Sequence, residues 1–229
     1  MLSTSQLASP LYILRWFLKT KLAWKLSGIS LTTSLLATKG YTSFTRYRED
    51  SRNFALRLRS YLKPTDTVLD FGCGIGGYAF EVSKFCKVVV GIDINEFYIR
   101  LAKKLYAKKA SKVKFYWYNG DNIPFNDCSF DMIYVHAVFE RIPKTSVEKY
   151  LKEFWRILRP NGKLLADFLR EEASDSDFVS LLGPDAYIFW SEWELINVLA
   201  KSGFRVQNLI KTSEKFIVFA INIKSLNMK

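Results

Sequence analysis

From Asp66 onward the chain alternates short β-branched apolar runs with longer stretches in which apolar residues recur every three or four positions. The short runs predict strands, and the longer spacing predicts helices. The predicted helices are Gly77–Phe85, Glu96–Lys109, Ser146–Leu158 and Glu192–Lys201. The predicted strands are Thr67–Phe71, Val88–Ile92, Val113–Tyr118, Met132–Val135, Lys163–Phe168, Arg205–Lys211 and Phe216–Ile223.

This alternation predicts an α/β domain with a mostly parallel sheet that helices cover on both faces. The last two strands are separated only by the polar residues from Thr212 to Lys215. So short a link cannot hold a crossover, so we expect these two strands to pair antiparallel.

The first 62 residues differ in character and predict a separate helical segment. Residues 11–26 predict a helix that follows Ser9-Pro10, because proline is favoured at the first helical position. Charged residues interrupt its apolar run, so we expect no membrane-spanning helix. No basic residue precedes the apolar stretch and no small-residue cleavage site follows it, so we expect no signal peptide either. A second helix is expected from Arg46 to Leu62. We therefore divide the chain into an N-terminal segment, 1–62, and a domain, 63–229.

The excess of basic residues is concentrated at the N-terminus. The chain has 34 Lys and Arg against 22 Asp and Glu, a net charge of +12, and no acidic residue precedes Glu49. The basic and aromatic residues of 11–26 are typical of a helix that lies in a membrane interface. They also suit a helix that packs its aromatic rings on its own domain and caps the substrate site. Both interpretations stay open.

Three scattered cysteines without a C-x-x-C pair fit a reducing compartment, and we expect a cytoplasmic protein, at the inner face of the membrane if the helix is interfacial. The single histidine, His136, excludes a His-rich metal site, and we predict no metal ion.

The strongest chemical signal is VLDFGCGIGG, from Val68 to Gly77, in which a predicted strand runs into a helix through a glycine loop. Gly72, Gly74 and Gly77 satisfy the dinucleotide pattern G-x-G-x-x-G. Asp70 at the strand end argues against a dinucleotide, because its carboxylate would repel a pyrophosphate and attract an amino group or a sulfonium. The loop therefore favours S-adenosylmethionine over a nicotinamide cofactor.

Three later motifs follow the loop: VVVGIDIN with Asp93, the pair Gly120-Asp121, and LRPNGKLLADF from Leu158 to Phe168. Together with the loop, they resemble the class I S-adenosylmethionine-dependent methyltransferases of the type 11 branch. The resemblance runs from about Tyr61 to Phe168 and more weakly to Phe204. The resemblance implies a Rossmann-like, doubly wound, seven-stranded sheet, mostly parallel with an antiparallel last strand, plus N-terminal helices. It also implies that Asp93 takes the ribose hydroxyls and that Asp121 and Ile123 contact the adenine. The full set of implied cofactor-binding residues is Asp70, Gly72, Cys73, Gly74, Gly76, Asp93, Ile94, Asp121, Asn122, Ile123 and His136.

The sequence departs from the family where Glu-His usually follows the fourth strand, because Glu140-Arg141 stands there. Arg141 cannot act as a base, but it can hold a carboxylate or a phosphate; the alternative is a surface arginine that pairs with Glu140 or Glu148. His136 is the candidate catalytic base, or a residue of the cofactor edge. Alignment of the acceptor with the methyl group can also suffice without a base. Further candidate substrate contacts are Tyr41 and Trp190.

These features predict an S-adenosylmethionine-dependent methyltransferase for a small-molecule, glycan or lipid-linked acceptor, with O-methylation by alignment as the expected reaction. The expected partners are that acceptor and a membrane surface, contacted through residues 11–26. One alternative is an RNA methyltransferase that uses the basic surface, although no RNA-binding module is recognisable. Another is a cofactor-binding protein without catalysis, which the absent Glu-His would explain.

Overall fold

A computed structural model describes residues 44–106, 111–173 and 187–224 of the 229-residue chain. The helix expected at 11–26 and the candidate contact Tyr41 lie outside these ranges. The chain divides into two compact units, Met1–Arg48 and Glu49–Lys229, and the elements that form the site belong to the second. The division of roles between 1–62 and 63–229 stays a prediction.

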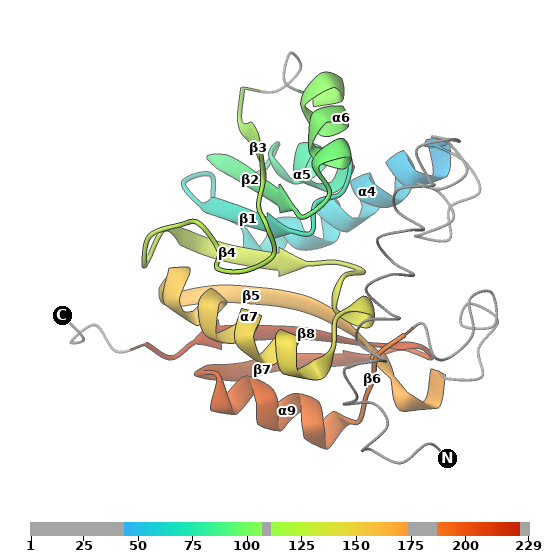
Figure 1. Ribbon diagram of the computed structural model, residues 1–229, viewed down its shortest axis with the longest axis vertical. Helices are drawn as coiled ribbons and strands as arrows, with labels where there is room; N and C mark the ends of the chain where they lie inside the picture. Colours follow the sequence, from blue (N-terminus) through green and yellow to red (C-terminus); the bar gives the residue numbers. More distant parts are fainter. Residues whose placement is uncertain (1–43, 107–110, 174–186, 225–229) are drawn as a thin grey trace. The chain divides into compact units, whose positions relative to one another are not determined.

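The strands form one sheet in the order β3-β2-β1-β4-β5-β8-β7, with β6 beside β5 (Figure 1). The strands β1 to β5 pair parallel, whereas β8 runs antiparallel to both β5 and β7. The predicted fold class and the antiparallel final pair are confirmed. The bounds are β1 Thr67–Phe71, β2 Val88–Asp93, β3 Val113–Trp117, β4 Phe130–Val135, β5 Leu158–Arg170, β6 Phe189–Trp190, β7 Phe204–Lys211 and β8 Lys215–Asn222.

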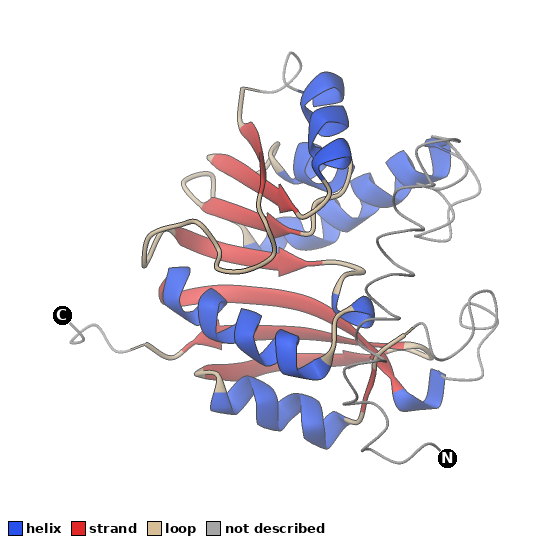
Figure 2. Ribbon diagram, in the orientation of Figure 1, coloured by secondary structure: helices blue, strands red, loops and turns tan. Residues whose placement is uncertain are grey.

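Helices lie on both faces of this sheet (Figure 2). Their bounds are α4 Phe44–Leu58, α5 Gly77–Val82, α6 Glu96–Tyr106, α7 Lys144–Ile157 and α9 Glu192–Lys201, with the short 3-10 turns η2 Arg59–Tyr61, η3 Phe139–Arg141 and η4 Glu171–Ala173. Ser191 begins α9 with a capping box, in which its Oγ accepts from the N–H of Glu194 and the Glu194 carboxylate accepts from the N–H of Ser191. Within the described ranges, no helix is long and apolar enough to cross a membrane.

Most strands lie within one or two residues of their predicted bounds, but β5 and β6 differ more. The strand β5 begins at Leu158 rather than Lys163, because Leu158 pairs with Phe130 before the register shifts and Lys163 pairs with Met132. The intervening Arg-Pro-Asn-Gly looks like a turn in the sequence, and Asn161 does adopt a positive φ of 60°, but the chain continues in the sheet as a bulge. The two-residue strand β6 was not predicted, since so short a run gives no alternation signal.

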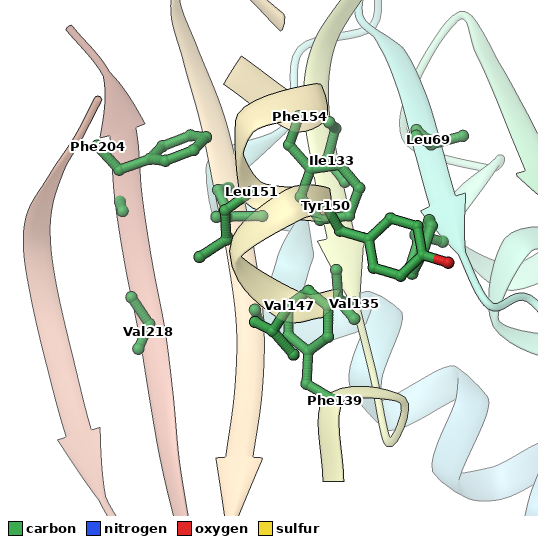
Figure 3. Packing of buried hydrophobic residues seen from close by; sticks show 14 of the residues in the cluster. Leu69, Ile133, Val135, Phe139, Val147, Tyr150, Leu151, Phe154, Phe204 and Val218 are labelled. Atoms are coloured by element: carbon green, nitrogen blue, oxygen red, sulfur yellow. The ribbon is translucent and has the colours of Figure 1, made fainter. Parts of the chain in front are cut away.

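One hydrophobic core lies between the sheet and the helices α7 and α9. Val147, Leu151 and Phe154 of α7 are fully buried against Ile133 and Val135 of β4, as Figure 3 shows. The apolar positions of α7 recur every three or four residues, so a single helix face supplies these contacts. This core fixes which side chains of the strands are left for the other face.

Strand alternation places the chemically interesting side chains together on that other face. Alternate residues of a strand share a face, so Asp70, which pairs with Tyr134, points away from α7 while Leu69 and Ile133 point towards it. By the same alternation, Asp167 points away from the core that holds Ala166 and Phe168. The site therefore forms where β1, β4 and β5 end.

Candidate functional site

The glycine loop is fastened to the end of β2. The N–H groups of Gly72 and Cys73 both donate to the carbonyl of Ile92, at 2.9 and 3.0 Å. Asp93 then accepts from the loop through Oδ2, 2.9 Å from the Gly74 nitrogen, and from the start of α6 through Oδ1, 2.8 Å from the Asn95 nitrogen. This carboxylate therefore sets the spacing between the loop and the end of β2.

Gly74 and Gly76 serve different purposes in the loop. Both have positive φ, +54° and +82°, a backbone conformation that L side chains rarely adopt. A Cβ on Gly76 would stand 2.4 Å from the ring of Phe115, so the loop packs tightly there. A Cβ on Gly74 would meet no atom of the described chain within 4 Å. The backbone at Gly74 is thus open to a ligand.

Asp70 is buried at the end of β1. Its neighbour on β4 is the fully buried Tyr134, and burial together with the charge of Asp70 raises the pKa of Tyr134 well above its usual value. The phenol therefore keeps its proton beside the carboxylate. Cys73 is also buried, with its Sγ against Gly91, so the thiol contributes to packing.

The residues expected around an adenine ring lie at the ends of β2 and β3. Ile94 is 54% exposed, and its side chain lies against Gly120, next to Asp121. The Asp121 carboxylate accepts from the side chain of Asn119 at 2.8 Å, and Asn122 is exposed. Ile123 differs, because its side chain is buried in the main core. The structure therefore offers Ile94 as the apolar surface at this edge.

The arrangement fits S-adenosyl-L-methionine. An open backbone at Gly74 lets a ligand approach the loop closely. The carboxylates of Asp93 and Asp70 suit hydroxyl groups and a cationic amino group or sulfonium, and the exposed Ile94 suits a flat ring.

His136 is the first residue after β4, and its imidazole contacts three side chains. Its Nδ1 lies 2.9 Å from Oδ2 of Asp167. The ring centroids of Phe54 and Tyr78 lie 4.9 and 4.8 Å from that of the imidazole. The hydroxyl of Tyr78 in turn donates to Asp50 at 2.6 Å. The side chain is still 24% exposed, so part of the imidazole stays accessible.

Asp167 belongs to a buried charge cluster that also contains Lys215 and Glu140. Its Oδ1 accepts from the N–H of Ala137 at 2.8 Å, and its Oδ2 lies 3.1 Å from Nζ of Lys215. Nζ of Lys215 is also 3.0 Å from Oε2 of Glu140. Burial acts to raise the pKa of Asp167, but Lys215 and His136 hold it well below its usual value. Burial likewise acts to lower the pKa of Lys215, but Asp167 and Glu140 raise it.

Arg141 and Trp190 have different surroundings. The Arg141 guanidinium lies over the ring of Tyr187, 4.8 Å from its centroid. Burial raises the pKa of the Tyr187 phenol although Arg141 acts to lower it. Glu140, which the sequence offered as a partner for Arg141, binds Lys215. Trp190 is packed in the core against Phe168, with centroids 5.6 Å apart, so core packing accounts for this residue.

Sequence reasoning missed Asp167 and Lys215. Asp167 carries a usable signal, because it is a lone carboxylate within the apolar stretch LLADFL. Lys215 carries none, since it looks like part of the polar link between the last two strands. The structure makes it the first residue of β8.

Comparison with known proteins agrees with this geometry. Residues 69–166 match the family described as methyltransferase domain. The chain is 36% identical over 110 residues to the sterol 24-C-methyltransferase of Pneumocystis carinii (strain B80), which covers 47% of this chain and 29% of that protein. It is 33% identical over 147 residues to phosphoethanolamine N-methyltransferase 2 of Caenorhabditis elegans, which covers 62% of this chain and 33% of that protein.

A solved structure also matches over most of its length. The chain superimposes on an S-adenosylmethionine-dependent methyltransferase from Aquifex aeolicus with a TM-score of 0.61 and 25% identity, covering 75% of this chain and 89% of that one. Against the two curated relatives, the chain spans only 29% and 33% of their length. Residues 69–166 therefore belong to the methyltransferase domain family, and the chain carries a class I methyltransferase domain whose cofactor is S-adenosyl-L-methionine.

Proposed function

We propose that this protein transfers the methyl group of S-adenosyl-L-methionine to a hydroxyl group of a small or lipid-linked acceptor, beside His136. The observation that carries the proposal is the position of His136 next to the cofactor loop. Phe71 pairs with Val135, so the residue that follows each strand, Gly72 and His136, stands at the same edge of the sheet. Val138 packs directly against Gly72, which keeps the two loops together.

Each group at this edge has a defined task in the proposed reaction. The cofactor supplies a methyl group that its sulfonium already activates. The loop and Asp93 orient the cofactor, while the rings of Phe54 and Tyr78 pack against His136 and shield that part of the imidazole from water. Alignment of the acceptor with the methyl group supplies much of the acceleration. The Nε2 edge of His136 then receives the proton that the acceptor hydroxyl loses.

The acceptor class is proposed from two supports. The curated relatives are named for a sterol and for phosphoethanolamine, which favours a lipid or a lipid headgroup over a nucleic acid. Arg141, on the turn η3 that follows His136 in the chain, suits an anionic group on the acceptor. Contact of residues 11–26 with a membrane would bring such an acceptor near, and it stays part of the proposal.

The test measures binding and transfer separately on the full-length protein. Calorimetry is expected to show binding of S-adenosyl-L-methionine and no binding of NAD. Incubation with methyl-labelled cofactor and sterol-containing vesicles or lipid-linked glycan is expected to yield a labelled product by mass spectrometry. Phosphoethanolamine has an amino group and no alcohol hydroxyl, so a labelled product from it would show N-methylation and contradict the proposed reaction. Binding without a product from any of these classes, or from a total lipid extract, would favour the non-catalytic alternative. Labelled RNA would favour the RNA methyltransferase.

Substitution of Arg141 tests the anionic part of the acceptor. The variant Arg141→Lys keeps the charge but loses the planar, two-pronged geometry of the guanidinium. We expect KM for the acceptor to rise about tenfold, with kcat and cofactor affinity unchanged, because only uniform binding is lost. The matched control is Arg159→Lys, because Arg159 lies at the start of β5 and pairs with Asp131. Its KM for the acceptor should equal that of wild type. Equal KM values for Arg141→Lys and wild type would make Arg141 a structural residue.

A further inference from the structure

We infer that Lys215 sets the charge around His136: it neutralises one of two buried carboxylates, so that the imidazole stays available to accept a proton while Asp167 orients it. The inference rests on the proposed function, in which His136 is the base. It makes Asp167 and Lys215 positioning residues of the site.

The geometry of the cluster carries this inference. Oδ2 of Asp167 is shared, because Nδ1 of His136 lies 2.9 Å and Nζ of Lys215 3.1 Å from the same oxygen. The second carboxylate, Glu140, lies 3.0 Å from the same Nζ. The side chains of Asp167 and Glu140 are only 7% and 3% exposed. Two carboxylates therefore share one ammonium group, and the cluster has one net negative charge when His136 is neutral.

The hydrogen bond fixes the useful tautomer of His136. An ionised Asp167 only accepts, so Nδ1 carries the hydrogen and Nε2 keeps its lone pair. In the proposed step the acceptor oxygen bonds to the methyl carbon, the carbon–sulfur bond breaks with its electron pair on sulfur, and the hydroxyl proton passes to Nε2. The imidazolium that forms is stabilised by Asp167 and later loses its proton to water.

In the proposed proton transfer to His136, the net charge of Asp167, Glu140 and Lys215 matters. Without Lys215, Asp167 and Glu140 would together attract a proton to the imidazole before any acceptor binds. Without Asp167, the imidazole would lose its orientation and the charge that stabilises its protonated form. One ammonium between two carboxylates leaves a single net negative charge beside the ring.

Other titratable groups lie on the elements next to His136, and each has contacts of its own. From α5, the hydroxyl of Tyr78 donates to Asp50 of α4. From β1 and β4, Asp70 lies beside Tyr134, which is protonated. From η3, Arg141 lies over Tyr187. Among the contacts of the described residues, Lys215 is the cation that touches the carboxylate holding His136.

The chain has one histidine, so its imidazole can be titrated directly by NMR, without substrate or activity. We expect Lys215→Met to move the midpoint of that titration upwards by about one pH unit, because a nearby positive charge is lost. Asp167→Asn is expected to move it downwards by about one pH unit, because a nearby negative charge is lost. Opposite shifts from two residues in contact distinguish a charge effect from general loosening.

Two further variants control for folding and for charge in general. Lys215→Met leaves two buried carboxylates without a cation and can unfold the domain. The double variant Glu140→Gln/Lys215→Met restores the net charge of the cluster and is expected to fold and to titrate within about 0.3 pH unit of wild type. Lys211→Met removes an exposed lysine that pairs with Glu192, and should leave the midpoint unchanged.

The outcomes separate this inference from the proposed function. Midpoints that stay at the wild-type value in both Lys215→Met and Asp167→Asn would overturn it, as would equal shifts from Lys215→Met and the double variant. If Lys215→Met does not fold, an unshifted Asp167→Asn would overturn it. Where an acceptor has been found, the acid limb of kcat/KM should move as the NMR midpoint does. Shifted midpoints in a protein that transfers no methyl group would uphold the cluster and refute the function.

Discussion

Replacement of Asp93 by alanine is expected to weaken binding of S-adenosyl-L-methionine by about 1.5–3 kcal/mol, or about 10- to 150-fold. Two effects add. The charged acceptor proposed for the ribose hydroxyls is removed, and the N–H groups of Gly74 and Asn95 lose the oxygens that hold the glycine loop against α6. Calorimetric titration of the folded variant measures the loss.

The matched control is Asp127→Ala, which removes an exposed carboxylate bound to Arg156 after β3. Its cofactor affinity should equal that of wild type. An Asp93→Ala protein with wild-type affinity would refute the assignment of this residue to the cofactor site.

Alanine at the two loop glycines should affect different properties, mainly stability at Gly76 and mainly cofactor binding at Gly74. Gly76→Ala is expected to destabilise the fold by about 2–5 kcal/mol, because a positive φ is costly for alanine and the new Cβ would stand 2.4 Å from Phe115. Gly74→Ala has the positive φ but no such contact in the described chain, so its loss should be only about 1–2 kcal/mol. Its Cβ would instead occupy space open to the cofactor, so binding should fall at least about tenfold.

Urea unfolding and calorimetry on the same two proteins check this contrast. A Gly74→Ala variant that binds the cofactor normally would mean that the open space at Gly74 is not the binding surface. A Gly76→Ala variant as stable as wild type would show that Phe115 can move aside at little cost.

The fold was largely predictable because its signals are local. The strand Thr67–Phe71 and the helix Glu192–Lys201 have the predicted bounds, since the strand is a short run that ends at a glycine and the helix begins at the capping residue Ser191. The predicted start of β5 at Lys163 was wrong, because the preceding Pro-Asn-Gly has the composition of a turn. In the structure, pairing of Leu158 with Phe130 of β4 starts the strand earlier. Tertiary pairing overrides local preference there.

Some residues of the site were also predictable from local sequence, whereas others depend on tertiary pairing. Asp70, Asp93 and the glycines were predictable, since each stands at a fixed offset from a strand end. The partners of His136 were not, because Asp167 and Lys215 come to it from distant parts of the chain through the register of β5 and β8. No local pattern records that register, so only the assembled sheet reveals why the imidazole is held as it is.

The insertion of β8 between β5 and β7 has a consequence for the order of folding. The sequence places β8 after β7, yet β8 separates β7 from the rest of the sheet. Chain synthesis therefore completes Glu140 and Asp167 well before the strand that brings Lys215, and the edge of β5 has no antiparallel partner until β8 arrives. Pairing across so long a stretch of chain is a slow event. The ammonium that balances the two carboxylates thus comes with the last strand to be synthesised, and a protein without β8 would lack both the strand that joins β7 to β5 and the cation of the cluster.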